Sequence, residues 1–211
     1  MNIDPRHEQI AALEAQLALL KKDAPPPAPQ VAASPPLKLD LGCGKNKRDG
    51  FHGVDQYPMQ NVDTVADLRG PWPWADSSVE EIHCSHFLEH LTAPERMHFF
   101  NEAWRVLKPG AKATIITPNW SSARAYGDMT HQWPPVGYFT WPYLSKDWRK
   151  ANAPHCDAEW LKGGYCCDFD HTTGYSLRAD LQMRNPEYVQ AALASQIETG
   201  QDIVATLVCK K

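Results

Sequence analysis

The sequence predicts an α/β protein with a mostly parallel sheet and an antiparallel last strand, and two observations carry this prediction. First, after residue 36 short apolar segments with strand character are followed by segments with the 3.6-residue period of a helix. Second, residues 37–211 contain enough chain to bury one complete hydrophobic core. Alternating strands and helices favour right-handed crossovers and a doubly wound parallel sheet. We therefore expect a single domain over 37–211.

The elements of this domain can be assigned in order. Strands are predicted at 37–41, 52–56, 63–68, 79–85 and 111–118. The strongest helix covers 94–110, with Pro94 at its start and a stop at Pro109-Gly110. The tail adds the segment 175–181, a helix over 186–198 and a final strand over 202–210. We expect that last strand to be antiparallel and to lie at or near an edge of the sheet.

Two further segments precede the domain. Residues 1–22 form a predicted amphipathic helix, because Ile10, Leu13, Leu17 and Leu20 repeat at spacings of 3, 4 and 3. Residues 23–36 form a linker rich in Pro and Ala, which favours extended conformations and a semi-rigid spacer. A helix this short gains stability mainly by packing. Residues 7–22 therefore either pack on their own domain, or on nothing, or mediate self-association or docking to a partner as a short coiled coil.

Charge and composition exclude several classes of protein. The chain has 21 basic and 25 acidic residues, a net charge of -4. This balance lacks the basic face of a nucleic-acid-binding module, so a nucleic-acid partner is not expected. Neither a run of about 18 apolar residues nor a secretory signal is present, and we expect no membrane partner and a cytoplasmic location. The six Cys residues are too few and too irregularly spaced for a disulfide framework, so they should be free thiols.

A glycine-rich loop follows the first strand. Gly42 and Gly44 allow a sharp turn and the close approach of a ligand to the backbone. A dinucleotide fingerprint needs a third small residue where this chain has Lys47, and the triphosphate-binding P-loop pattern is absent. The loop therefore favours a nucleoside-type cofactor without phosphates.

Five segments in the same order and spacing resemble the class I S-adenosylmethionine-dependent methyltransferases. They are LDLGCG at 39–44, GVDQ at 53–56, ADL at 66–68, PWPWADSSVEEIHCSHFLEHL at 71–91 and RVLKPGAKATIITPN at 105–119. The resemblance implies a Rossmann-like doubly wound fold and S-adenosylmethionine as cofactor. It also implies an enzyme that transfers a methyl group to an oxygen or nitrogen acceptor. The acceptor would be a small molecule, a glycan or a protein side chain.

The resemblance also implies roles for individual residues. Asp55 would bind the ribose hydroxyls, with a turn cap as the alternative, and Asp67 would accept from the adenine amino group beside Leu68, or be a solvated turn residue. Asp40 would bind the methionyl ammonium directly or through water, or would have a structural hydrogen-bonding role, because an unpaired carboxylate in an apolar strand is costly. The complete expected cofactor set is Asp40, Gly42, Cys43, Gly44, Asp55, Gln56, Asp67, Leu68, Ser85 and His86.

One departure from the family pattern keeps a second function open. Only residues 45–51 separate Gly44 from His52, so the long helix that usually follows the glycine loop is replaced by a turn. This shortening leaves the part of the cofactor site beside the glycine loop more open. The alternative is a non-catalytic binding or assembly module that keeps the fold and joins a larger complex through its N-terminal helix.

The acceptor is expected at residues 119–165, an insertion with ten aromatic residues and several prolines. These rings form either an aromatic acceptor pocket or a satellite core. Within it, His131 is the candidate general base, oriented by Asp128, with a loop histidine capping a turn as the rival interpretation. Tyr126 or Arg124 would bind the acceptor.

No metal site is predicted. The set His155, Cys156, Cys166, Cys167 and His171 matches no compact zinc-ligand spacing. We expect His83, His86 and His90 to pack in the core or to line the cofactor site.

Overall fold

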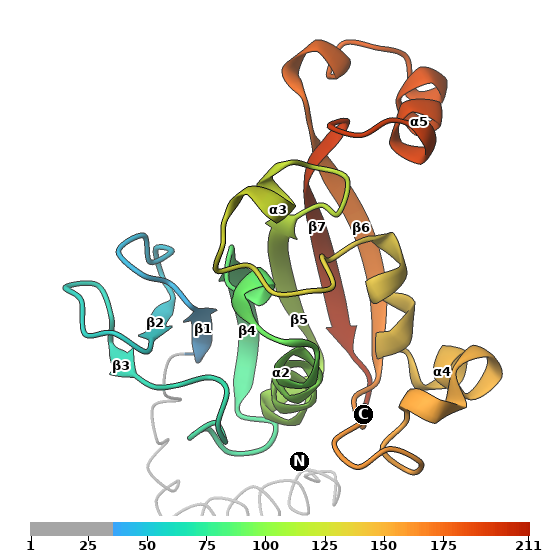
Figure 1. The fold of residues 1–211 in the computed structure, drawn as a ribbon. Coiled ribbons are helices and arrows are strands. Elements are labelled where there is room, and N and C mark those ends of the chain that lie inside the picture. Colours follow the sequence, from blue (N-terminus) through green and yellow to red (C-terminus); the bar gives the residue numbers. More distant parts are fainter. Residues whose placement is uncertain (1–35) are drawn as a thin grey trace, which may run out of the picture. The chain divides into compact units, whose positions relative to one another are not determined.

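The computed structural model describes residues 36–211, and the predicted N-terminal helix and all but the last residue of the linker lie outside the described residues. The described chain forms a seven-stranded sheet of order β3-β2-β1-β4-β5-β7-β6 (Figure 1). The strands are β1 (Lys38–Leu41), β2 (His52–Asp55), β3 (Thr64–Val65), β4 (Val79–Ser85), β5 (Leu107–Pro118), β6 (Phe169–Leu177) and β7 (Gly200–Cys209). This order is that of a Rossmann-like sheet.

The strand directions confirm the predicted mixed sheet. Strands β3, β2, β1, β4 and β5 pair in parallel, and β7 is antiparallel to both β5 and β6. The last strand therefore lies next to the edge, and β6 is the edge itself. Strand β6 starts at Phe169, whereas the sequence singled out only 175–181. Its polar stretch Thr172-Thr173-Gly174 hides the strand pattern, because an edge strand has little apolar surface to bury.

Among residues 36–211 the two predicted helices are present, and two short helices lie in the insertion. They are α2 (Ala93–Val106), α3 (Arg124–Gly127), α4 (Lys146–Asn152) and α5 (Pro186–Ser195), with 3-10 turns at Leu88–His90, Tyr138–Thr140, Pro142–Leu144, Pro154–Cys156 and Ala179–Leu181. As predicted, residues 45–51 form no helix. The predicted stop of α2 at Pro109-Gly110 is wrong, because the backbone turns extended at Leu107 and that pair lies inside β5.

The core lies between α2 and one face of the sheet. Phe99, Phe100 and Val106 of α2 are fully buried with strand residues such as Leu39 and Ile115. Figure 1 shows α2 lying across β4 and β5. Side chains on the other face of the sheet, such as Thr114, Val204 and Thr206, are only half-buried.

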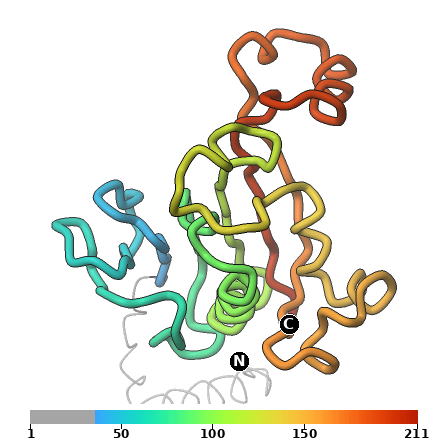
Figure 2. Tube along the Cα trace, in the orientation of Figure 1, coloured from blue at the N-terminus to red at the C-terminus, as the bar shows by residue number. Residues whose placement is uncertain are grey.

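The insertion after β5 is firmly anchored. Its chain passes in front of the sheet before returning as β6 (Figure 2). Arg149 is fully buried, pairs with Asp157 at 3.2 Å, and donates to the carbonyls of Tyr143 and Cys167. A buried guanidinium satisfied in this way fixes the surrounding loops.

No helix among residues 36–211 is long and apolar enough to cross a membrane.

Candidate functional site

The glycine turn after β1 requires glycine at both positions. Gly42 has φ +67° and Gly44 has φ +51°, a region that residues with a Cβ rarely adopt. A Cβ on Gly42 would also lie 2.5 Å from the ring of Phe87, whereas one on Gly44 would meet nothing within 4 Å. The turn is held on β2, because the Gly44 N–H donates to the Asp55 carboxylate at 2.9 Å.

Asp40 braces this loop from inside. Its side chain is buried, one oxygen accepts from the Arg48 N–H at 2.7 Å, and the other lies 2.8 Å from His83 Nδ1. Both carboxylate oxygens therefore have protein partners, which favours the structural role of Asp40 over direct contact with a ligand.

Four of the expected cofactor residues lie together at the carboxyl ends of β2 and β3. Asp55, Gln56, Asp67 and Leu68 line a narrow cavity of about 70 Å³. The cavity is closed by residues that follow β4, namely Phe87, His90 and Leu91. The loops around it must part to admit a nucleoside.

The two carboxylates of this cavity have different surroundings. Asp55 accepts from the N–H groups of Gly44 and Tyr57, and its unused lone pairs remain for a ligand. Asp67 is paired with Arg69, with Nη2 and Oδ2 2.8 Å apart. The hydrogen bonds from the Arg69 side chain lower the pKa of Asp67. Asp67 is therefore an ionised acceptor at neutral pH.

The end of β4 contributes Ser85 and His86. His86 has φ +54°, a strained backbone for a non-glycine residue. Its Nδ1 lies 3.2 Å from Glu89 Oε1, and this hydrogen bond raises the pKa of His86.

Cys43 in the glycine turn is buried, and burial raises its pKa to about 11. The Cys43 thiol is therefore uncharged near neutral pH and is a poor nucleophile.

A second cavity of about 360 Å³ adjoins the first at the ends of β4 and β5. It is lined by His86, Glu89, His90, Pro118, Arg124, Gly127, Asp128 and His131. His90 lines both cavities. The structure thus brings the candidates Arg124, Asp128 and His131 into one wall beside the expected cofactor residues. Tyr126 does not line this cavity, and its side chain is 53% exposed.

The histidine and aspartate of this cavity are close but not hydrogen-bonded. His131 Nε2 lies 3.8 Å from Asp128 Oδ2, while His131 Nδ1 lies 3.3 Å from the Ala125 carbonyl oxygen. Asp128 instead accepts from the N–H and hydroxyl of Thr130. These bonds lower the pKa of Asp128. The backbone carbonyl, rather than the carboxylate, faces the Nδ1 of His131.

Sequence reasoning missed Glu89. It lies in the turn that follows β4, is 5% exposed, and places its carboxylate in the second cavity. Its oxygens contact His86 Nδ1 and Thr117 Oγ1. The available signal was a carboxylate between the apolar residues of HFLEHL, because a buried charge needs a partner or a function.

Arg96 of α2 ties the two sides of this cavity together. It is buried and donates to the carbonyls of Leu88 and Glu89 on one side and of Gln132 and Pro134 on the other. The segments that carry Glu89 and His131 are therefore bridged by one guanidinium.

The aromatic insertion divides between two roles. Trp120, Tyr138 and Phe139 line a large cavity of about 890 Å³ together with Tyr175 of β6 and residues of α5. Trp141, by contrast, is fully buried against Phe100. The insertion thus supplies an aromatic cavity wall, while Trp141 joins the main core rather than a separate satellite core.

Comparison with known proteins agrees with this arrangement. Residues 52–115 match the family model described as a methyltransferase domain, while no curated protein matches. A solved S-adenosylmethionine-dependent methyltransferase from Archaeoglobus fulgidus has a TM-score of 0.57 and 18% identity. That comparison covers 82% of this chain and 86% of the other.

Two more distant structures align with TM-scores below 0.5. The complex of the Haloferax volcanii Trm112 methyltransferase activator with a methyltransferase gives 0.48 at 15% identity, covering 83% of this chain and 82% of the other. Phosphoethanolamine N-methyltransferase 2 from Haemonchus contortus gives 0.44 at 15% identity, covering 94% of this chain and 53% of that one. Residues 52–115 thus match a methyltransferase-domain family model, and the structural likeness shows that the chain shares the Rossmann-like fold of the Archaeoglobus fulgidus protein.

Proposed function

We propose that this protein transfers a methyl group from S-adenosylmethionine to an oxygen or nitrogen acceptor. The observation that carries the proposal is the meeting of two cavities at the carboxyl edge of the sheet. One is lined by four of the expected cofactor residues, and the other by His86, Glu89 and His131. In open α/β sheets, ligands bind at this edge. When bound, S-adenosylmethionine supplies an electrophilic methyl group.

The residues of the first cavity fit the nucleoside part of this cofactor. Asp55 is fixed by two backbone N–H groups and partly exposed, so it can accept hydrogen bonds from vicinal hydroxyls. Asp67 would accept from the adenine amino group, and the buried Leu68 would lie beside the ring. The glycine turn, formed by Gly42, Cys43 and Gly44, would present its backbone to the cofactor. The edge of the cofactor site would be formed by Gln56, Ser85 and His86.

The second cavity would hold the acceptor. The Nδ1 of His131 faces a carbonyl oxygen, which only accepts hydrogen bonds, so the ring presents an Nε2 lone pair. This lone pair would accept the proton of an acceptor O–H or N–H group. Arg124 and Asp128 would line the acceptor, and Tyr126 would reach it from the exposed rim. The residues that line the aromatic cavity are all uncharged. This cavity would bind an apolar part of the acceptor.

A non-catalytic binding or assembly module is the second candidate function. It is favoured by the small volume of the first cavity and by the missing helix after Gly44. In that case the fold serves as a scaffold, and no S-adenosylmethionine binds.

Calorimetric titration with S-adenosylmethionine distinguishes the two functions. We expect saturable binding by the wild type and a loss for Asp55→Ala of about 1.5–3 kcal/mol for each hydrogen bond lost. One such bond corresponds to about a 10- to 150-fold weaker affinity. Asp49→Ala, an exposed carboxylate of the adjacent loop, is the matched control and should bind normally. No binding by the wild type at millimolar ligand would remove the enzyme proposal.

A further inference from the structure

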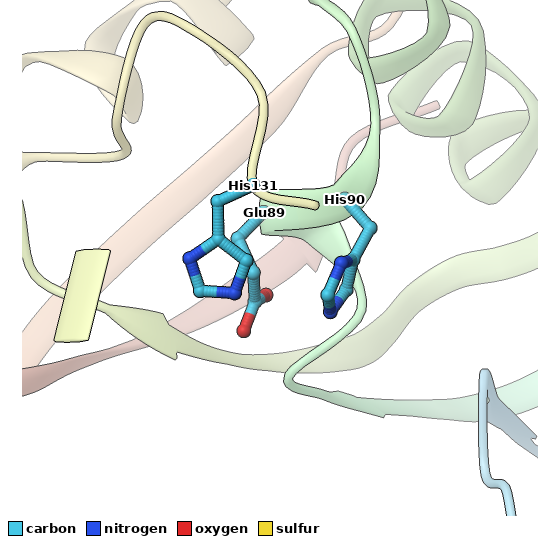
Figure 3. Close-up of side chains that lie close together, drawn as sticks. All are labelled: Glu89, His90 and His131. Atoms are coloured by element: carbon cyan, nitrogen blue, oxygen red, sulfur yellow. The ribbon is translucent and has the colours of Figure 1, made fainter. Parts of the chain in front are cut away.

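Three side chains that are far apart in the sequence converge in the second cavity. Glu89, His90 and His131 each offer one ligand atom, and these atoms lie within 4.8 Å of one another. Figure 3 shows the two imidazole rings on either side of the Glu89 carboxylate. Among residues 36–211 this is the only group of three such residues close enough to share a metal ion. The group differs from both histidine sets considered in the sequence.

The Glu89 carboxylate contacts one histidine and one hydroxyl, but among residues 36–211 it has no Lys or Arg partner. It is 5% exposed, and its ion-pair partner within residues 36–211 is His86 at 3.2 Å. The nearby Arg96 donates to the backbone oxygen of Glu89 and not to its carboxylate. Burying a carboxylate without a firm counter-charge is costly. A cation in the cavity would balance this charge.

The hydrogen bonds of His90 leave its second nitrogen free. Thr130 Oγ1 lies 2.7 Å from Asp128 Oδ1, and a carboxylate only accepts, so the hydroxyl proton of Thr130 is committed there. The oxygen of Thr130 must then accept from His90 Nδ1, 2.9 Å away. In the neutral ring, Nε2 therefore carries a lone pair. The carboxylate, hydroxyl and imidazole form the kind of outer chain that orients metal-binding histidines.

His131 is fixed in the same tautomer by a different group. Its Nδ1 faces the Ala125 carbonyl oxygen, so its Nε2 also carries a lone pair. That Nε2 lies 3.8 Å from Asp128 Oδ2 without a hydrogen bond. The Nε2 lone pair is therefore not used by Asp128 and can bind a cation together with Glu89 and His90.

We propose that Glu89, His90 and His131 bind a divalent first-row metal cation that holds an oxygen acceptor with a second oxygen on the neighbouring atom. Two imidazoles and one carboxylate suit Zn²⁺, Mn²⁺ or Co²⁺ and leave coordination positions open. Mg²⁺ prefers oxygen ligands and should bind more weakly. The cation site stands on the cluster alone, whereas the acceptor class rests on the proposed methyl transfer.

The position of the site connects the cation with the acceptor. His90 lines both cavities, so the ion would sit where the acceptor and the methyl donor meet. Two open, adjacent positions are filled best by two adjacent oxygens of one ligand. A bound cation lowers the pKa of a coordinated hydroxyl. His131 would then act as a ligand, and the hydroxyl proton would leave to water. The oxygen would form its bond to the methyl carbon as the bond from that carbon to the sulfonium breaks, which releases S-adenosylhomocysteine.

Metal titration of the full-length protein tests the site. After treatment with a chelator, the protein is titrated with CoCl₂, MnCl₂ and ZnCl₂, and binding is followed by calorimetry and by the visible absorption of Co²⁺. We expect one ion per chain. Glu89→Gln and His131→Asn should each weaken binding at least tenfold, and Thr130→Val, which removes an outer hydroxyl, should weaken it about 10- to 100-fold.

Controls separate loss of the site from loss of the fold. His171→Asn changes a half-buried histidine of β6 outside the site and should bind the ion normally. His90→Asn alters an exposed ligand, so it remains informative if Glu89→Gln does not fold. Circular dichroism checks each variant. No binding of any of the three ions by the wild type, or unchanged affinity in all of the folded ligand variants, would overturn the proposal.

Two further arms test the acceptor class and its dependence on the proposed function. Catechol should bind in the presence of the cation at least tenfold more tightly than phenol, and equal affinities would overturn the acceptor class. Titration with S-adenosylmethionine is run on the same samples. Normal cation binding without any cofactor binding would support the ion site and reject the methyltransferase proposal.

Discussion

The guanidinium of Arg96 offers a quantitative test of how the second cavity is held together. In Arg96→Met a chain of similar length loses its donors to the carbonyls of Leu88, Glu89, Gln132 and Pro134. Leu88 and Glu89 are buried, so water reaches their carbonyls poorly. Each of these carbonyls keeps one backbone donor, the Leu91 N–H for Leu88 and the Gln132 N–H for Glu89, so the cost is that of the lost charge-assisted hydrogen bonds, about 1.5–3 kcal/mol each.

Removing the buried charge returns part of this cost, because a guanidinium is desolvated only at a penalty. We therefore expect a net loss of about 3 kcal/mol, which corresponds to a fall in Tm of about 6–12 °C for a domain of this size. Differential scanning calorimetry measures the change. The matched control is Arg178→Met, since Arg178 pairs only with Asp180 at the exposed surface, and its effect should stay within about 1 kcal/mol. A Tm for Arg96→Met within 2–3 °C of the wild type would refute the bridging role.

Two further predictions concern the glycine turn and the acid stability of α2. Gly42→Ala should destabilise the protein by about 1–3 kcal/mol more than Gly44→Ala in urea unfolding, because both positions are strained but only Gly42 also meets Phe87; equal effects would contradict the packing argument. The Glu102 carboxyl has a pKa held below its ordinary 4.5 by hydrogen bonds from Arg105. The ionised Glu102 carboxylate therefore stabilises the fold fully above the ordinary pKa of 4.5. This stabilisation is lost as the pH falls through the lower pKa of the folded state. Glu102→Gln should lower Tm at pH 7 and reduce the drop in Tm between pH 5 and pH 3; an unchanged acid profile would exclude Glu102 as a contributor.

The parts of the fold that could be predicted are those with local signals. Parallel strands β1, β4 and β5 have apolar residues at most of their buried positions, and the positive φ of Gly42 and Gly44 explains the glycines of the turn. Strand β6 was largely missed, because its pairing with β7 supplies the order that its polar sequence does not. The helix stop at Pro109-Gly110 was a strong local signal, but pairing of the following residues with β4 and β7 extended the strand over it.

The candidate site likewise contains residues that the sequence could predict and residues that it could not. Asp55 and His86 could be named from strand ends, since each follows a strand at the carboxyl edge of the sheet. Glu89 and His131 come together through long-range contacts, including the Gln132 N–H bond to the Glu89 carbonyl at 2.8 Å. No local pattern records such a contact. Trp120 and Trp141 also look alike in the sequence, yet the first is 49% exposed in a cavity wall and the second is fully buried.

Methyl transfer itself is the most direct test of the proposed function. The full-length protein is incubated with methyl-labelled S-adenosylmethionine and fractions of a cell extract, with and without added Mn²⁺, and the label is followed into products. The proposal predicts labelling of a discrete acceptor by the wild type and by Asp49→Ala, and strongly reduced labelling by Asp55→Ala. Absence of labelling by the wild type in every fraction, or equal labelling by Asp55→Ala, would contradict it.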